Sequence, residues 1–172
     1  ASRGLGDVYK RQIVKAYTTR VGNGPFPTEL FDDTGARLAD KGQEFGATTG
    51  RPRRCGWFDA PIVRFAARIN GLTGLALTRL DILDKLEHLK FCVAYRWGEQ
   101  LLQDFPTDQG VLSFCEPVYE EIEGWCVPTK EARRLEDLPM AARHYVERIA
   151  QLTGTPVTFV SVGPERAATI VV

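Results

Sequence analysis

The residues whose types are best suited to binding a ligand lie in one stretch of a dozen, Gly46–Trp57, which we call the arginine loop. It contains the hydroxyls of Thr48 and Thr49 and, directly after Gly50, three arginines at positions 51, 53 and 54. A guanidinium group is a planar fork of donors that matches a carboxylate or a phosphate at two points. Hydroxyls and glycine amides add short donors where the backbone must approach a ligand closely. This composition predicts an anion-binding loop.

The charge balance of the whole chain limits what that anion can be. The chain has 22 Lys and Arg residues against 22 Asp and Glu residues, so its formal net charge is zero. Nucleic-acid-binding proteins usually carry a basic excess, whereas the positive charge here is local. The sequence therefore favours a small acidic ligand and no nucleic acid. On the arginines alone, an ordinary solvated surface loop remains the alternative.

Two further motifs follow predicted strands. Thr78-Arg-Leu-Asp81 closes a strand expected over 75–80, and Ser161-Val-Gly163 closes one expected over 157–162. Ligands of α/β proteins bind at the carboxyl ends of strands. A carboxylate there can accept two parallel hydrogen bonds from guanine N1–H and N2–H₂, a donor pair that adenine lacks. From spacing alone, a simple capping role for Asp81 and an ordinary turn at 161–163 remain the favoured alternatives.

Hydrophobic periodicity predicts the elements that would position these motifs. Strands are expected over residues 12–19, 75–80, 90–95, 118–123, 157–162 and 168–172, and helices over 58–70 and 138–152. A short helix over 35–41, a turn or short helix over 82–86 and a hairpin arm over 99–106 are also expected. Strands that alternate with helices indicate the α/β class, here with a mixed, mainly parallel sheet and flanking helices.

Composition excludes several other classes. No uninterrupted apolar run approaches the ~20 residues of a membrane span, so we expect no membrane partner. The four cysteines form no Cys-x-x-Cys pair, and the two histidines, His88 and His144, lie far apart in sequence and are interpreted as surface residues. A zinc site is therefore not expected. Reduced thiols and a cytoplasmic location fit these cysteines.

The arginine loop also belongs to a set of motifs that resembles the C-terminal part of adenylosuccinate synthetase. The other motifs are the segments 13–30, 68–74, 77–81, 92–95, 116–120 and 161–166, in that order. So many colinear motifs are specific. The resemblance covers residues 13–172 and implies a GTP-dependent carbon–nitrogen ligase of AMP biosynthesis. That family joins L-aspartate to IMP and releases adenylosuccinate, GDP and phosphate.

The resemblance also implies roles for individual residues. Aspartate would contact Val21, Ala47, Thr48, Thr49, Gly50, Arg51 and Arg53, and Arg51 would also reach IMP. GTP would contact Arg53, Arg79, Leu80, Asp81, Ser161, Val162 and Gly163. Arg79 stands where the family usually has lysine, and the family gives Arg54 no ligand role.

The remaining expectations concern what this chain lacks. Residues 1–12 have no counterpart in the family and are interpreted as an extraneous tail, which leaves 13–172 as the C-terminal part of the synthetase domain. The sequence contains no Gly-x₄-Gly-Lys-Ser/Thr phosphate loop. In the family, the phosphate loop, the catalytic residues and the Mg²⁺ ligands lie in the N-terminal half. No catalytic or metal-binding residue is therefore expected here, and the piece alone is expected to be inactive.

The resemblance implies a homodimer for the complete protein. One alternative from another class stays open. A non-catalytic module could bind a nucleotide or an acidic ligand through the arginine loop without any ligase activity.

Overall fold

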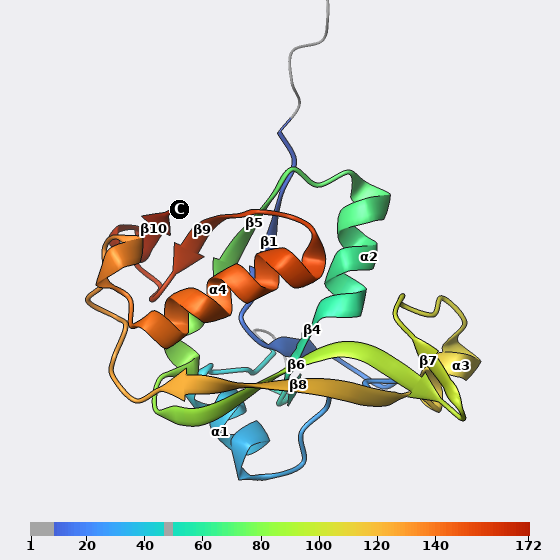
Figure 1. The fold of residues 1–172 in the computed structure, drawn as a ribbon. Coiled ribbons are helices and arrows are strands. Elements are labelled where there is room, and N and C mark those ends of the chain that lie inside the picture. The colour runs from blue at the N-terminus through green and yellow to red at the C-terminus, as the bar shows by residue number, and fades with distance from the viewer. Residues whose placement is uncertain (1–8, 47–49) are drawn as a thin grey trace, which may run out of the picture.

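A computed structural model describes residues 9–46 and 50–172, and its first sheet has four strands (Figure 1). In spatial order these are β1 (Arg11–Lys15), β5 (Gly74–Thr78), β9 (Val157–Ser161) and β10 (Thr169–Val171). The first three run parallel, and β10 returns antiparallel to β9. Because β5 and β9 are parallel neighbours, their carboxyl ends meet at the same edge of the sheet.

The second sheet is built on a long antiparallel ribbon of β6 (Leu86–Trp97) and β8 (Glu116–Trp125). Strand β4 (Phe58–Asp59) pairs parallel with β6, and β7 (Gln100–Leu102) pairs antiparallel with it. A separate two-stranded sheet joins β2 (Thr18–Arg20) to β3 (Arg54–Gly56). This small sheet anchors the second half of the arginine loop.

Within the described residues, four α-helices accompany the sheets, each begun or ended by a recognisable cap. They are α1 (Asp33–Lys41), α2 (Ala60–Asn70), α3 (Gln109–Ser113) and α4 (Met140–Thr153). The Asp59 carboxylate accepts the amide of Ile62 at the start of α2. Helices α2 and α4 end at Gly71 and Gly154, which adopt left-handed conformations that favour glycine.

Helix α4 joins the two sheets. It contacts β8, β9 and α2, and Figure 1 shows it crossing between the first sheet and the β6–β8 ribbon. Tyr145 of α4 stacks on Phe91 with ring centroids 4.5 Å apart and meets Trp125 edge-on. Its hydroxyl donates to the carbonyl of Ala16, 2.6 Å away, in the link between β1 and β2. A single aromatic cluster therefore ties both sheets into one core.

The α/β class with a mainly parallel sheet is confirmed, and the strand expected over 12–19 differs in detail. It begins at Arg11 and breaks at Ala16 and Tyr17, because β1 pairs with β5 whereas β2 leaves that sheet to pair with β3. The last two residues of segment 1–12 thus form part of the first sheet. Its assignment as an extraneous tail stays a prediction.

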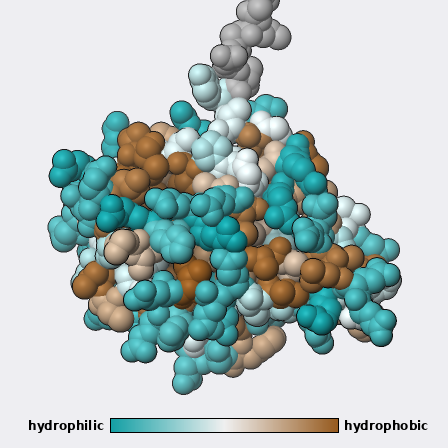
Figure 2. Space-filling model, in the orientation of Figure 1, coloured by the Kyte–Doolittle hydropathy of each residue, from teal (hydrophilic) through white to brown (hydrophobic). Residues whose placement is uncertain are grey.

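The surface keeps several large apolar side chains. Figure 2 shows apolar side chains gathered on the visible face near β10 and near β7. Val171, Leu101 and Phe114 are among the exposed large hydrophobic residues. Apolar atoms contribute much of the surface of any folded protein, so these side chains do not by themselves mark a site.

Candidate functional site

The predicted guanine-binding residues meet at the edge where β5 and β9 end. Four of them line a pocket of about 510 Å³, which we call the strand-end pocket, whereas Arg53, also predicted to contact GTP, is not part of its walls. Its walls include Arg79 and Asp81 after β5 and Ser161 and Gly163 from the end of β9. Lys41 and Gln43, at the end of α1, complete it and were not predicted. Two motifs about 80 residues apart in sequence thus face one cavity.

Asp81 and Arg79 owe their positions to a tight turn. Asp81 lies in the short 3₁₀ helix η1 (Leu80–Leu83), where burial raises the pKa of its carboxyl. Arg79 precedes that helix in a left-handed conformation with φ of 63°, which is unfavourable for a residue with a side chain. Its guanidinium donates to the carbonyl of Gly42 and lies 3.8 Å from the carboxylate of Glu44. Such backbone strain concentrates at functional sites.

Two other predicted residues contribute differently. Leu80 and Val162 are fully buried and belong to the main core, so their side chains do not face the strand-end pocket. Only their backbone could meet a ligand. The Ser161 hydroxyl donates to the carbonyl of Gly163, 2.7 Å away, within its own turn. A Cβ added at Gly163 would lie 3.2 Å from the Cβ of Ala168, so glycine suits this close approach.

The arginine loop is closed at its base by a short backbone ladder. The amide of Arg53 donates to the carbonyl of Glu44, 2.7 Å away, and the amide of Gly46 donates to the carbonyl of Arg51, 2.8 Å away. Gly50 has a φ of 62°, which fits the tight turn expected there. Three residues predicted to contact aspartate, Ala47, Thr48 and Thr49, lie outside the described residues.

The described part of the arginine loop lines a second pocket, of about 370 Å³, which we call the arginine-loop pocket. Arg51 and Arg53 line it together with Val21, the residue from the preceding segment that was predicted to contact aspartate. Val21 is 75% exposed, so this mouth is open to solvent. The structure therefore brings together the three described residues with side chains that the aspartate prediction named.

Arg54 also lines the arginine-loop pocket, but its donors are occupied by the protein. Its guanidinium meets both carboxylate oxygens of Glu29 and donates to the carbonyls of Gly22 and Gly24, at 3.2 and 2.8 Å. The hydrogen bond to Glu29 raises the pKa of Arg54. This arginine fastens the glycine-rich loop to β3, which is a structural role.

Between the two pockets lies Glu44, a carboxylate with no exposed surface. Lys15 Nζ lies 2.7 and 2.8 Å from its two oxygens, the Tyr17 hydroxyl 2.6 Å from Oε1, and an Arg53 nitrogen 3.0 Å from Oε2. Burial opposes ionisation of Glu44, but the donors Lys15 and Tyr17 outweigh it and lower its pKa. Sequence reasoning missed this residue, because an acidic side chain after Gly42-Gln43 carries no distinctive signal.

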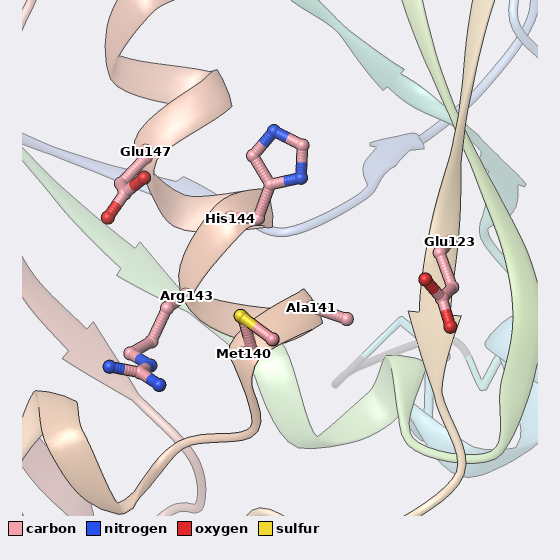
Figure 3. Close-up of a pocket in the computed structure, with 6 residues that line it drawn as sticks. All are labelled: Glu123, Met140, Ala141, Arg143, His144 and Glu147. Atoms are coloured by element: carbon pink, nitrogen blue, oxygen red, sulfur yellow. The ribbon is translucent and has the colours of Figure 1, made fainter.

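A larger pocket, of about 630 Å³, holds none of the predicted site residues. Figure 3 shows Glu123 on β8 and five residues of α4 around it: Met140, Ala141, Arg143, His144 and Glu147. Its walls mix both charge signs, with exposed Glu147 and His144 on the outer face of α4. Volume alone therefore does not identify the functional site.

Among residues 9–46 and 50–172, no group of three or more His, Cys, Asp or Glu side chains is placed to hold a metal ion. Within the same residues, none of the helices combines the length and the apolar character needed to cross a membrane.

Comparisons of the sequence with a family model and with individual proteins point to the same family. The sequence model described as adenylosuccinate synthetase matches residues 5–170. The adenylosuccinate synthetase of Geobacillus kaustophilus is 55% identical over 160 residues, covering 93% of this chain and 37% of the relative. That of Gloeobacter violaceus is 56% identical over 160 residues, covering 93% of this chain and 36% of the relative.

The fold agrees with that match. A solved structure of fully ligated adenylosuccinate synthetase from Plasmodium falciparum superposes with a TM-score of 0.89 at 39% identity, covering 93% of this chain and 39% of that one. The chain spans a little over a third of the length of the relatives it matches. Sequence and fold both show that it belongs to the adenylosuccinate synthetase family.

Proposed function

We propose that this chain supplies the guanine pocket and the aspartate loop of an adenylosuccinate synthetase. The complete enzyme joins L-aspartate to IMP, uses GTP, and releases adenylosuccinate, GDP and phosphate. The observation that carries the proposal is the strand-end pocket, where Arg79 and Asp81 face Ser161 and Gly163 across one cavity. Family membership supplies the reaction.

Asp81 is the guanine-reading residue in this proposal. Its carboxylate accepts the N1–H and N2–H₂ donors of guanine, and the stem of Arg79 lies along the base. The turn 161–163 closes the other side of the pocket with its backbone and the Ser161 hydroxyl. A bound guanine strengthens these hydrogen bonds by excluding water from a partly buried carboxyl group.

The arginine loop binds aspartate in the same proposal. Arg51 pairs with a carboxylate of aspartate at two points and also reaches the IMP side. Arg53 lies between the aspartate and the GTP side, next to Glu44. Thr48, Thr49 and the backbone near Val21 add further donors. Several donors around a dianionic substrate orient its amine toward the activated carbon of IMP.

The remaining parts of the reaction rest on the family. The IMP 6-oxygen is first phosphorylated, and the aspartate amine then displaces the resulting phosphate. Both steps need catalytic groups that we assign to the N-terminal half. Mg²⁺ supplies charge neutralisation on the phosphates when bound, but the described residues offer no ligand cluster for it. The homodimer and the cytoplasmic location are likewise predictions from the family.

A turnover assay of the full-length protein tests the proposal. The protein, incubated with IMP, L-aspartate and GTP, should form adenylosuccinate, and ATP should not replace GTP. Omission of aspartate should abolish the product. Binding of guanine nucleotide without any product, under conditions where a known relative is active, would favour the non-catalytic binding module instead.

A further inference from the structure

The strand-end pocket and the arginine-loop pocket share one buried carboxylate. Glu44 binds an Arg53 nitrogen at 3.0 Å, and Arg79 Nε lies 3.8 Å from its other oxygen. Arg53 lines the arginine-loop pocket and Arg79 lines the strand-end pocket. The side chain of Glu44 has no exposed surface, whereas those of Arg53 and Arg79 are 31% and 40% exposed. The buried carboxylate therefore cannot face solvent itself, but it contacts two arginines that each line a pocket.

The path of the chain reinforces this link. Lys41 and Gln43 line the strand-end pocket, and Gly46 lines the arginine-loop pocket, so the backbone passes from one pocket to the other through Glu44. The backbone of Glu44 is also joined to that of Arg53, whose amide donates to the Glu44 carbonyl. A shift of Glu44 would thus move a wall of both pockets together.

The charges at this junction are unequal. One carboxylate, Glu44, meets three cations, Lys15, Arg53 and Arg79. The Tyr17 hydroxyl donates to the same carboxylate, so its orientation is fixed by short hydrogen bonds on both oxygens. The excess positive charge favours anionic ligands, while the buried anion holds the cations in place.

We propose that Glu44 is a positioning residue that orients Arg53 and Arg79 together and thereby couples aspartate binding to GTP binding. The proposal rests on the proposed function of the two pockets. Glu44 itself touches neither substrate. It acts on Arg53 through a hydrogen bond and on Arg79 through charge, since Arg79 donates to the carbonyl of Gly42 while its Nε lies 3.8 Å from the Glu44 carboxylate. A change in that carboxylate therefore alters both arginines.

The test is steady-state kinetics on the full-length protein carrying Glu44→Gln, a change that keeps the shape and removes the charge. The Michaelis constants for aspartate and for GTP should both rise, each by roughly tenfold, as expected when charge-assisted hydrogen bonds are lost. Glu44→Asp, which keeps the charge, should restore part of both. On an Arg79→Ala background, Glu44→Gln should raise the constant for aspartate as before and the constant for GTP by less than it does with Arg79 present, because only Arg53 then links Glu44 to GTP.

Two further variants keep the test decisive. Glu120→Gln is the matched control, because Glu120 forms a two-point pair with Arg148 that lines neither pocket, and both Michaelis constants should stay unchanged. Tyr17→Phe keeps the buried ring and removes only the hydroxyl that holds Glu44, so it should raise both constants less than Glu44→Gln does. It decides the matter if Glu44→Gln does not fold.

A purely structural role would give a different result. Glu44→Gln or Tyr17→Phe would then lower the melting temperature and the amount of active enzyme, with both Michaelis constants equal to those of the wild type. A rise in only one constant would overturn the coupling. Failure of the wild-type protein to form adenylosuccinate would instead reject the proposed function, before any variant is compared.

Discussion

At the scale of single residues, burial and the carboxylates that hold Arg53 and Arg54 separate the roles of neighbouring side chains of the same type. Arg51 is exposed, Arg53 shares the buried Glu44, and Arg54 is held by Glu29 and two carbonyls. The sequence predicted that this run would bind an anion, but it could not assign a separate role to each arginine. That division depends on Glu29 and Glu44, which lie 25 and 9 residues before the arginines they pair with.

Base choice is the first residue-scale prediction. In the full-length protein, Asp81→Asn replaces one acceptor by a donor facing guanine, which should cost roughly 2–4 kcal/mol of GTP recognition. Xanthosine triphosphate, whose edge is complementary to the amide, should be used better by the variant than by the wild type. Michaelis constants for both nucleotides measure the exchange, and an unchanged constant for GTP would reject the assignment of Asp81.

The arginines give the second prediction. Arg51→Leu should raise the Michaelis constant for aspartate by orders of magnitude, since a two-point contact with a carboxylate is lost. Arg54→Leu should instead lower stability, by on the order of 1–3 kcal/mol, because it leaves Glu29 without its partner. Kinetics and thermal unfolding of both variants separate the two roles. Identical behaviour of Arg51→Leu and Arg54→Leu would show that the loop is structural throughout.

The buried Asp59 gives a pH prediction. Burial raises its pKa to about 6 despite hydrogen bonds from Tyr95 and the amide of Ile62. Between about pH 4 and 6 the folded chain therefore binds more protons than the unfolded chain, and this group lowers stability as pH rises. Asp59→Asn keeps an oxygen for the helix cap and removes the titration.

The measurement is the free energy of unfolding of both proteins from pH 4 to pH 7. Relative to the wild type, Asp59→Asn should gain up to about 3 kcal/mol across that range. The difference between the two proteins isolates Asp59, because other titrating groups are common to both. A difference that does not change with pH would show that the carboxyl titrates normally.

At the scale of elements, periodic segments were predictable and pairings were not. The expected helices over 58–70 and 138–152 correspond to α2 and α4, which have regular apolar faces and end at left-handed glycines. The strand expected over 12–19 divides between two sheets, because its central residues turn into the core. Such a division depends on β3 and β5, which lie far along the chain, so no local pattern could reveal it.

Short elements were missed for a related reason. Helix α3 has five residues, too few to show a helical period, although Asp108 caps it by accepting the amides of Gly110 and Val111. The ribbon of β6 and β8 extends well beyond the expected 90–95 and 118–123, since cross-strand pairing continues to Leu86 and Trp125 at one end and to Arg96 and Glu116 at the other. The edge that carries the site was predictable because β5 and β9 are strongly apolar.

The turn after β5 gives a prediction at this scale. Arg79 holds a left-handed conformation, so Arg79→Gly removes both the side chain and the backbone strain, whereas Arg79→Ala removes only the side chain. The glycine variant should be the more stable of the two by about 1 kcal/mol. Both should weaken GTP binding in the full-length protein to the same extent. Thermal unfolding and GTP affinity measure the two effects, and equal stability would contradict the strain.

At the scale of the whole molecule, the two pockets are open sites on a chain that spans a little over a third of its relatives' length. In the proposed function, the strand-end pocket presents the Asp81 carboxylate as an acceptor for a guanine base, and the arginine-loop pocket presents donors for carboxylates. Among the described residues, neither pocket is lined by a histidine, and the sequence contains no Gly-x₄-Gly-Lys-Ser/Thr phosphate loop. Recognition and chemistry are thus assigned to different parts of the complete enzyme, and they can be tested separately.

The last prediction uses that separation. The purified 172-residue chain should form no adenylosuccinate from GTP, IMP and aspartate, whereas the full-length protein should, because the chain has no Gly-x₄-Gly-Lys-Ser/Thr sequence to hold the phosphates. Product formation by both proteins is measured under identical conditions, and a cooperative thermal transition of the chain serves as the control that it is folded. Turnover by the folded chain alone would mean that catalytic groups lie within these residues. It would also require a new assignment for at least one of the two pockets.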